Sequence, residues 1–566
     1  MSSFFIIINK NHSSAKDHSH LFPGYSKGVS NNIEIYYTGN KDTLLFNFVG
    51  EKKFIISGLG IQNSNQLKFL LKSDWEKILD NNVSRVNRLD GHFAGCLIEG
   101  GQVYCFNDKL GLREIYYYDD EEVICISTRI DLFKRLFNLT LSKTYLAGQW
   151  LTTCPPFFVS PYNEVKRLQP GGSLVVNRMH KISITNLQLT FAESRAEIIK
   201  EEIKKFTLVD YPGKKTSLGL SGGLDSRTLL AIMLNNKNDK FWTHTFGSKN
   251  MSDVKIAMQI ANKMNLKHKL YSSETVSADE AIKFIRNYIP FTGLTIPISD
   301  LIHIDYHRKI YDSNFLIQDG GFGEIGRRQY LNRFLLNGKK IIANQKTEEF
   351  VNALRIIKAD VFQPCFEKEL NEKLLIESEF VWENMRDISS NQKELWADMF
   401  MTRFKIPNGY SYGQHCLDQY SVAYMPFAQP SLLRLLLALN PRLKQNGKLY
   451  RSIIRSSEPS LGKINLVKDY VEYPYRLGTL SSHIVRKFTR KFSEVKTVDP
   501  IKYKIYDNLK EYIDDEISSR KVKENPYYDL NKIQYYFNEY YSGNKSVLPQ
   551  LDWWLTLNEW FKTYHI

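Results

Sequence analysis

The chain has 566 residues, which is more than one compact core usually holds, so two or more domains are expected. Apolar residues make up 43% of it and charged residues 24%, a balance that excludes a disordered or fibrous chain. Lysine and arginine number 76 against 61 aspartates and glutamates, a net charge of +15. That excess raises nucleic acid or a membrane surface as a partner, and it excludes no fold.

The apolar stretches are too short to cross a membrane. The run at residues 4–8 is typical of a buried strand rather than of a signal sequence. The run at 432–439 is interrupted by Arg434, whereas a spanning helix needs about 20 apolar residues. The six cysteines lack metal-binding spacing and indicate reduced thiols in a cytoplasmic protein: Cys96, Cys105, Cys125, Cys154, Cys365 and Cys416.

The first 190 residues have the pattern of antiparallel strands. Several segments alternate apolar and polar residues and are joined by short turns such as EGGQ and DDEE, which favours hairpins. Strands are expected within 4–10, 43–50, 92–108, 113–128 and 171–177. One helix is expected over residues 66–79.

The pattern changes between residues 190 and 217. An amphipathic helix over 195–206 leads to the turn YPGKK, and from 217 onward strands and helices alternate. Strands are expected at 217–220, 241–246 and 268–271, and helices at 227–235 and 253–264. This alternation with short loops predicts a parallel α/β sheet. The expected domains are therefore residues 1–190 and 191–566.

Helical patterns dominate from about residue 340 to the C-terminus. Arg486, Lys487, Arg490 and Lys491 are interleaved with apolar residues, which is typical of a solvated helix face. No RNA-binding signature, zinc module or basic arm accompanies the positive charge, so nucleic acid is not an expected partner. The basic excess indicates at most an acidic substrate or partner.

The segment TSLGLSGGLDSRTLL, residues 216–230, carries the most chemistry. Backbone N–H groups at a strand-to-helix turn converge on an anion, and glycines let phosphate approach closely. Ser221 and Ser226 can donate to phosphate oxygens, and Asp225 suits a Mg²⁺ ion between carboxylate and phosphate. The alternative is a tight turn in which Asp225 or Ser226 caps the helix. The complete SGGLDS pattern favours the phosphate site.

This hexapeptide resembles the pyrophosphate-binding loop of the N-type ATP pyrophosphatases, and its surroundings narrow the resemblance to the asparagine synthetase family. Residues 252–271, 418–433, 439–455 and 551–561 resemble parts of that family's synthetase domain, and residues 89–118 and 167–177 resemble its glutaminase domain. The resemblance implies an α+β N-terminal domain, an Ntn-hydrolase-like four-layer αββα sandwich. An α/β parallel-sheet ATP-pyrophosphatase domain with a helical C-terminal part would follow it.

The resemblance also implies a two-step ligase that uses ATP and Mg²⁺. A substrate carboxylate would attack the α-phosphorus of ATP, pyrophosphate would leave, and an amine would attack the acyl-adenylate. Asp225 would hold Mg²⁺, Phe246 would contact adenine through its backbone, and Lys468 would contact the phosphates and the reacting centre. The implied ATP-binding positions are Leu220, Ser221, Gly222, Gly223, Asp225, Ser226, Phe246 and Asp253.

The N-terminus departs from the family. Glutamine-hydrolysing members expose a Cys directly after the initiator Met as an N-terminal nucleophile, whereas this chain has Ser2 and Ser3 there. The family's R-G-P-D and N-G-E-I-Y-N segments have no match in the sequence. We expect a retained fold without glutaminase activity, although a serine can serve in that chemistry in principle. The amine would then be ammonia or an amine of the substrate.

A second departure lies in the synthetase domain. The family's S-G-E-G-x-D-E loop aligns with QDGGFGE, residues 318–324. Glu324 matches, but Gly320 stands at the catalytic Glu position and Gly323 at the Mg²⁺-binding Asp position. Asp319, one residue away, is a candidate substitute. The expected catalytic residues are Lys468, Asp319 and Glu324.

Several hypotheses stay open. The first is an amide ligase of the asparagine synthetase type, acting on a small-molecule or peptide carboxylate with a separate amine donor. A variant, as in β-lactam synthetases and lasso-peptide cyclases, closes an intramolecular amide. The second, which the glycines at 320 and 323 favour, is a non-catalytic nucleotide-binding protein. No membrane partner is expected, and a homodimer is compatible with the sequence.

Overall fold

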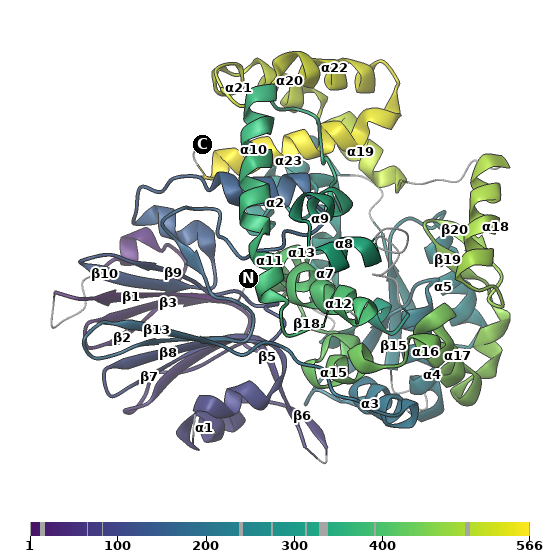
Figure 1. Ribbon diagram of the computed structural model, residues 1–566, viewed down its shortest axis with the longest axis horizontal. Coiled ribbons are helices and arrows are strands. Elements are labelled where there is room, and N and C mark those ends of the chain that lie inside the picture. Colours follow the sequence, from purple (N-terminus) through teal and green to yellow (C-terminus); the bar gives the residue numbers. More distant parts are fainter. Residues whose placement is uncertain are drawn as a thin grey trace.

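The computed structural model describes residues 2–11, 17–64, 66–81, 83–236, 241–272, 276–311, 314–327, 338–389, 392–492 and 498–564. Figure 1 shows two stacked antiparallel sheets on one side of the molecule and a parallel sheet with helices on the other. The C-terminal helices lie above both. Within the described part of the chain, no helix combines the length and the apolar character that crossing a membrane requires.

Two antiparallel sheets form the N-terminal part. The first has the order β11 (Lys166–Arg167), β9 (Tyr116–Asp119), β10 (Val123–Ser127), β1 (Ser3–Asn9), β3 (Ile33–Thr38) and β2 (Ser26–Ser30). The second has the order β13 (Ile182–Asn186), β12 (Gly172–Val176), β8 (Gln102–Asn107), β7 (Asp90–Glu99), β5 (Lys53–Asn63) and β4 (Leu44–Asn47). A short strand, β6 (Leu67–Phe69), pairs with the end of β5.

Alternation along the strands sorts their side chains into layers. Phe4, Ile6 and Ile8 of β1 lie in the core between the two sheets, because successive side chains of a strand point to opposite faces. The residues between them pack against α2 (Lys143–Leu151) in a second core. The outer face of the other sheet packs against α1 (Lys72–Asn81). The four-layer αββα sandwich predicted from the sequence is therefore confirmed.

The second part is built on a parallel sheet. Its order is β16 (His268–Tyr271), β15 (Phe241–Phe246), β14 (Lys215–Gly219), β17 (Phe315–Gln318) and β18 (Val422–Tyr424), and every neighbouring pair runs parallel. Helix α4 (Leu224–Asn236) connects β14 to β15, and α5 (Ser252–Lys263) connects β15 to β16. The predicted α/β sheet is confirmed, and the expected strand at 241–246 has the observed bounds.

One element expected from the sequence is wrong. Residues 66–79 do not form a single helix, because β6 takes their first part and α1 starts only at Lys72. Leu67 and Phe69 are bound by the ladder to β5, and the Asp74 carboxylate accepts the Leu71 backbone N–H at 3.1 Å. The long partner strand and this side-chain cap therefore set where the helix begins.

The remaining helices are mostly in the second half of the chain. They are α3 (Ala196–Leu208), α6 (Ala278–Tyr288), α7 (Ile302–Tyr311), α8 (Gly338–Asn344), α9 (Thr347–Leu354), α10 (Pro364–Ser378), α11 (Phe380–Asn384), α12 (Lys393–Phe400), α13 (Ile406–Gly409), α14 (Ser411–Leu417), α15 (Pro430–Ala438), α16 (Pro441–Lys444), α17 (Lys448–Ser457), α18 (Thr479–Phe492), α19 (Pro500–Asn508), α20 (Lys510–Ser518), α21 (Arg520–Lys523), α22 (Leu530–Tyr541) and α23 (Leu548–Tyr564). A hairpin of β19 (Leu466–Lys468) and β20 (Val471–Tyr473) precedes α18.

A buried ion pair joins the sandwich to the parallel-sheet part. The Arg113 guanidinium donates from Nε and Nη2 to the two carboxylate oxygens of Asp418, each at 2.6 Å. Their side chains are 1% and 0% exposed. Nearby, the Gln429 side chain accepts the Gly91 N–H at 2.8 Å. The two parts thus share a polar junction without water between these groups, which fixes their relative position.

Candidate active site

The SGGLDS loop lies at the carboxyl end of β14, where ligands of parallel α/β sheets bind. The Ser221 and Ser226 hydroxyls are 2.9 Å apart, and the Gly223 N–H donates to Ser221 Oγ at 3.2 Å. Asp225 and Ser226 stand in the first turn of α4, which starts earlier than the sequence pattern indicates. The loop hydroxyls and N–H groups therefore face one small region at a helix N-terminus, as a phosphate site requires.

The neighbouring strand end supplies an acidic and an aromatic group. Asp253, in the first turn of α5, accepts the Gly222 N–H on Oδ1 at 3.0 Å, and burial raises its pKa. Phe246 ends β15, and its ring is stacked on Tyr306 with centroids 5.4 Å apart. Leu220 is almost fully buried, and its carbonyl accepts the Thr245 hydroxyl. The structure thus gathers these expected ATP-site residues at one sheet edge.

The β19–β20 hairpin places Lys468 beside the loop. The Val467 N–H donates to the Gly222 carbonyl at 3.0 Å. A Cβ at position 222 would lie 2.5 Å from Val467 Cγ2, so only glycine permits this approach. Fully buried Arg227 of α4 donates to three backbone carbonyls of residues 461–465 and holds the segment before β19. Burial and, next, the Arg486 charge lower the pKa of Lys468.

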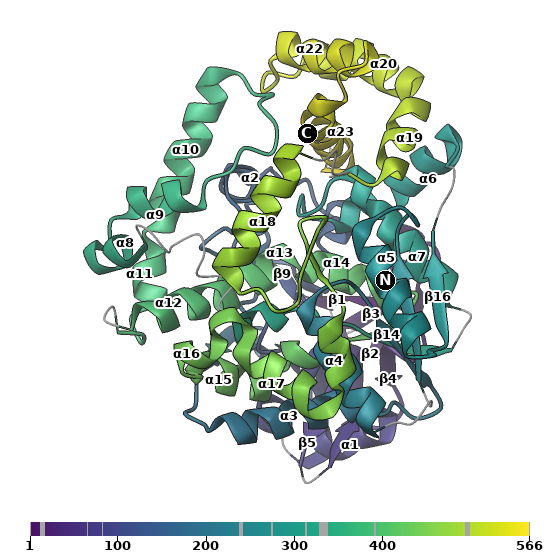
Figure 2. The ribbon, with the colours of Figure 1, turned by 90° about the vertical axis from the view of Figure 1, so that its right-hand side faces the viewer.

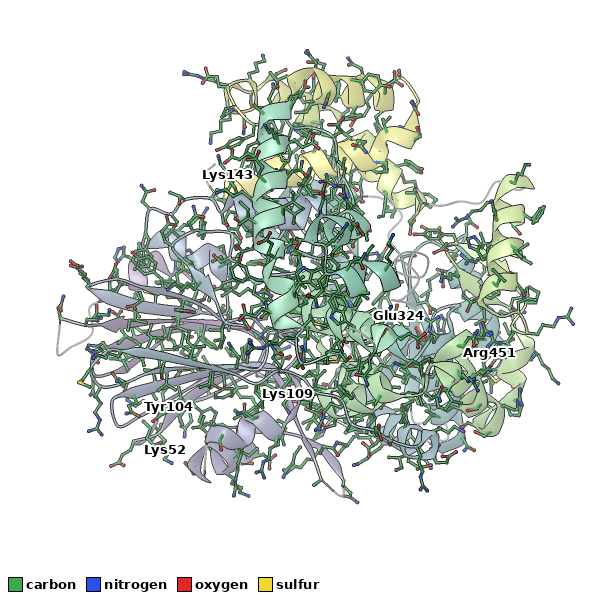
Figure 3. The ribbon with its side chains drawn as sticks, in the orientation of Figure 1. Lys52, Tyr104, Lys109, Lys143, Glu324 and Arg451 are labelled. Atoms are coloured by element: carbon green, nitrogen blue, oxygen red, sulfur yellow. The ribbon has the colours of Figure 1, made fainter. Side chains whose placement is uncertain are left out.

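The loop after β17 brings carboxylates to the same place. Asp319 is half-buried, accepts the Gly321 N–H at 2.6 Å, and has a pKa raised to about 6, mainly by desolvation. The Glu324 charge also raises the pKa of Asp319 and of Asp225. These three carboxylates therefore lie near one another, and Figure 3 labels Glu324 within the parallel-sheet part. Asp319, Glu324 and Lys468 are all brought to the loop.

Arg327 is a site residue that the sequence analysis missed. Its Nη2 donates to Asp225 Oδ2 at 2.5 Å. Burial raises the pKa of Asp225 to about 7, and Arg327 and Glu324 act on it with opposite signs. A 3₁₀ helix over Gly323–Arg327 turns the chain so that Arg327 points back to the loop. The arginines that follow QDGGFGEIG were the available signal, but only the turn shows that Arg327 reaches Asp225.

The two glycines that replace family carboxylates pack directly on Asp225. A Cβ at Gly323 would lie 2.5 Å from Asp225 Cγ, and a Cβ at Gly320 would lie 2.8 Å from the Ser226 backbone nitrogen. No side chain fits at either position while the loop keeps this conformation. The Tyr450 hydroxyl donates to the Gly323 carbonyl at 2.8 Å and holds the loop there.

Restoring the family carboxylate is therefore expected to damage the site. Gly323→Asp and Gly323→Ala should each lower the stability by about 1–3 kcal/mol, because the new Cβ overlaps Asp225. The unfolding midpoint in urea measures this. Gly413→Ala is the control, since a Cβ there meets nothing within 4 Å, and it should not lower the midpoint, because alanine favours helix α14 over glycine. A Gly323→Asp protein as stable as the parent would contradict the steric account.

The carboxylates suit a Mg²⁺ ion only together with phosphate. Asp225 Oδ1 is buried and has no hydrogen-bond partner among the described residues. All the residues that the structure describes include no group of three or more His, Cys, Asp or Glu side chains arranged to hold a metal ion. Mg²⁺ usually binds one or two carboxylates plus substrate phosphates and water. Asp225, with Glu324 beside it, fits that mode.

Three of the four basic residues expected on a solvated face of α18 are exposed: Lys487, Arg490 and Lys491. Arg486 is the exception. It is 6% exposed and is paired with Asp469, because the helix packs on the β19–β20 hairpin, and periodicity alone cannot say which helix face meets another element. Arg486, Lys487 and Arg490 line a cavity that also reaches Lys468. Figure 2 brings α18 to the front of the molecule.

The N-terminal serine is enclosed at the junction of the two parts. Ser2 is 0% exposed. Its hydroxyl is 2.7 Å from the Thr43 hydroxyl and donates to the Asp418 carbonyl at 3.3 Å. Its carbonyl lies 2.9 Å from His415 Nε2. Burial holds the pKa of His415 well below its usual range, so a neutral imidazole packs over the serine.

Comparison with protein families identifies part of this site. Residues 214–302 match the family model "Asparagine synthase", and this stretch contains the SGGLDS loop, Phe246 and Asp253. The resemblance expected from the sequence is confirmed there. No curated protein matches the chain.

Two solved structures share weak similarity with the chain. One is glutamine phosphoribosylpyrophosphate amidotransferase from B. subtilis, complexed with ADP and GMP, at 10% identity, a TM-score of 0.21 and coverage of 47% of this chain. This chain spans 59% of the length of that structure. The other, "the allosteric regulatory enzyme of purine biosynthesis", has 9% identity, a TM-score of 0.21 and covers 49% of this chain and 76% of its own. Similarity of this size carries neither enzyme's ligands over to this chain.

Proposed function

We propose that the protein is an ATP-dependent carbon–nitrogen ligase of the asparagine synthetase type. It activates a small-molecule or peptide carboxylate as an acyl-adenylate and transfers the acyl group to ammonia or to an amine. The observation that carries the proposal is that Glu324 and Lys468 converge on Asp225 of the SGGLDS loop at one sheet edge. The loop lies within the stretch that matches the asparagine synthase model.

ATP would lie along the carboxyl ends of β14 and β15. The adenine would meet the backbone at Phe246, where the aromatic ring and Tyr306 form an apolar wall. The pyrophosphate portion would take the N–H groups of the SGGLDS loop and the Ser221 and Ser226 hydroxyls, which now bond to each other. To bind it, these donors would exchange their present partners within the site, such as Asp253 and Ser221, for phosphate oxygens.

The reacting centre would lie beside Lys468. A carboxylate oxygen of the acid forms a bond to the α-phosphorus, and the bond from that phosphorus to pyrophosphate breaks. The amine nitrogen then attacks the acyl carbon, the bond to AMP breaks, and the amine loses a proton. Lys468 and Arg327 would hold the charge that develops on the phosphates. Mg²⁺, when bound by Asp225 and Glu324 with the phosphates, would neutralise further charge.

The ligase, the intramolecular cyclase and the non-catalytic binder differ in how pyrophosphate exchange depends on the acid that is added. Radiolabelled pyrophosphate should exchange into ATP only when the right acid is present, so the test is this exchange over a broad panel of acids. An intramolecular cyclase would show exchange with an acid that carries its own amine and would release AMP without added ammonia. Tight ATP binding without exchange over the panel would favour the non-catalytic nucleotide-binding protein.

We propose further that glutaminase activity has been lost. Its support is the enclosure of Ser2, whose hydroxyl and carbonyl are engaged by Thr43, Asp418 and His415. A nucleophile needs room for the substrate carbonyl about 3 Å away, and a residue that is 0% exposed has none.

Glutamine is accordingly expected to be inert. The protein should release no glutamate from glutamine above the uncatalysed background. Ser2→Cys, which supplies the family's nucleophile, should remain equally inactive because the enclosure is unchanged. Chromatographic measurement of glutamate checks both proteins, with ammonia-dependent amide formation as the control for an intact enzyme. Glutamate release by either protein would refute the proposed loss.

A further inference from the structure

A cavity of about 710 Å³ lies beside Lys468. Its walls are the β19–β20 hairpin, the start of α17 with the turn before it, and one face of α18. Figure 1 places these elements together at the right-hand end of the molecule. The volume is typical of small-molecule sites. Leu224 of the SGGLDS loop, Arg327 and Lys468 line one side of it, so the cavity adjoins the proposed nucleotide position and extends from it toward α18.

The lining of this cavity is strongly positive. Six of its side chains are lysine or arginine and one is a carboxylate: Arg327, Arg451, Lys468, Arg486, Lys487, Arg490 and Asp469. Arg486 and Arg490 share Asp469. Arg451, Lys468 and Lys487 have no carboxylate partner among the described residues. Figure 3 labels Arg451 at this end of the molecule.

Two buried donors in the lining lack acceptors. The Nε atoms of Arg327 and Arg486 are buried and have no hydrogen-bond partner within the described ranges. Both guanidinium groups are held by a carboxylate through another nitrogen, Arg327 by Asp225 and Arg486 by Asp469. Arg451 is differently placed, because its guanidinium donates to the carbonyls of Asn446 and Leu477 and keeps the wall in shape.

We infer that the acid activated by the proposed ligase carries at least one further anionic group, a phosphate, a sulfate or a second carboxylate, which this cavity holds. The inference rests on the proposed function. The carboxylate to be activated would lie at Lys468, where cavity and nucleotide position meet, and the further anion would lie toward Lys487 and Arg490 on α18. An acid with no further charge would leave those cations facing an uncharged ligand.

Binding without ATP tests the inference separately from the ligase reaction. Isothermal titration calorimetry would compare glucuronic acid 1-phosphate with glucuronic acid, and tricarballylate with butyrate. Each polyanionic probe should bind at least about tenfold more tightly than its monoanionic counterpart, since each hydrogen bond to a charged group contributes that much. The two pairs distinguish a phosphate from a carboxylate as the further group. Equal affinities within both pairs, or no binding by either polyanion, would overturn the inference.

Variants on α18 locate the effect. Lys487→Gln combined with Arg490→Gln should weaken polyanion binding about 10- to 100-fold and leave the monoanionic probes within about twofold. The matched control is Lys521→Gln with Lys523→Gln, two exposed lysines of α21, which removes equal charge elsewhere. Equal loss in the control would show a general charge effect and overturn the inference.

Pyrophosphate distinguishes the cavity from the nucleotide site. Magnesium pyrophosphate should bind the Lys487→Gln and Arg490→Gln protein as it binds the parent, and an equally weakened affinity would assign the cavity to the phosphates of ATP and overturn the inference. Polyanion binding that depends on α18, without any acid-dependent pyrophosphate exchange, would instead overturn the proposed ligase function and leave the anion site in place.

Discussion

Asp225→Asn is expected to lower acid-dependent pyrophosphate exchange about 100- to 1,000-fold, the size of effect that removal of one charge-stabilising group has in other enzymes. Asp225 is the carboxylate at the start of α4, its Oδ1 has no partner among the described residues, and its Oδ2 holds Arg327. The amide keeps the shape and can accept from Arg327, but it supplies no charge for Mg²⁺. Exchange measured at saturating ATP and acid checks this.

Two comparisons keep this result interpretable. Asp514→Asn replaces an exposed carboxylate of α20 and should leave exchange unchanged. Circular dichroism and the urea midpoint show whether Asp225→Asn is folded, because Arg327 loses a charged partner. A folded Asp225→Asn protein with exchange within threefold of the parent would refute the role assigned to Asp225.

Breaking the Arg113–Asp418 pair is expected to have the largest effect on stability. Arg113→Met should lower the free energy of unfolding by about 3–5 kcal/mol, because Asp418 is left as a buried carboxylate without its cation. Both oxygens of Asp418 are bound by Arg113 at 2.6 Å, and its side chain is 0% exposed. Urea unfolding followed by tryptophan fluorescence measures the change.

The double variant separates the cost of an unpaired charge from the worth of the pair. Arg113→Met with Asp418→Leu should recover most of the loss, since buried pairs are often replaced by apolar groups at little cost. Lys10→Met is the control, because it breaks an ion pair with Asp119 whose side chains are 19% and 40% exposed, and its effect should stay below about 1 kcal/mol. If Arg113→Met unfolds at the parent midpoint, the junction does not depend on this pair.

Local patterns predicted much of the fold because their physics is local. The parallel strands β14, β15 and β16 and the helices α4 and α5 follow from apolar periodicity and short loops, and β1 follows from its apolar run. Strands β17 and β18 of the same sheet were not predicted. The helix expected over residues 66–79 was wrong because the pairing of Leu67–Phe69 with β5 is a contact that no local pattern contains. The sequence pattern placed the start of α4 at residue 227 instead of Leu224, because helix ends are set by capping groups rather than by apolar periodicity.

The site could be predicted only where it is contiguous or resembles a family motif. The SGGLDS loop, Phe246 and Asp253 are close in the sequence, and the first strand-to-helix turns bring them together. Arg327 lies about a hundred residues from Asp225 and was missed, as its partner depends on the turn at Gly323–Arg327. The steric reason for glycine at 320 and 323 was equally out of reach, because it requires the position of Asp225.

The sequence by itself predicted antiparallel hairpins, a parallel α/β sheet and a Gly-rich strand-to-helix loop, since alternation, apolar runs and a six-residue motif express them directly. Its net charge of +15 had no assigned role at that stage. Tertiary structure alone decided that Arg486 of α18 is buried and lines one cavity with Lys468 and that Ser2 is enclosed. The physical reason is that packing between distant segments selects which helix face is buried, and periodicity describes a face without naming its partner.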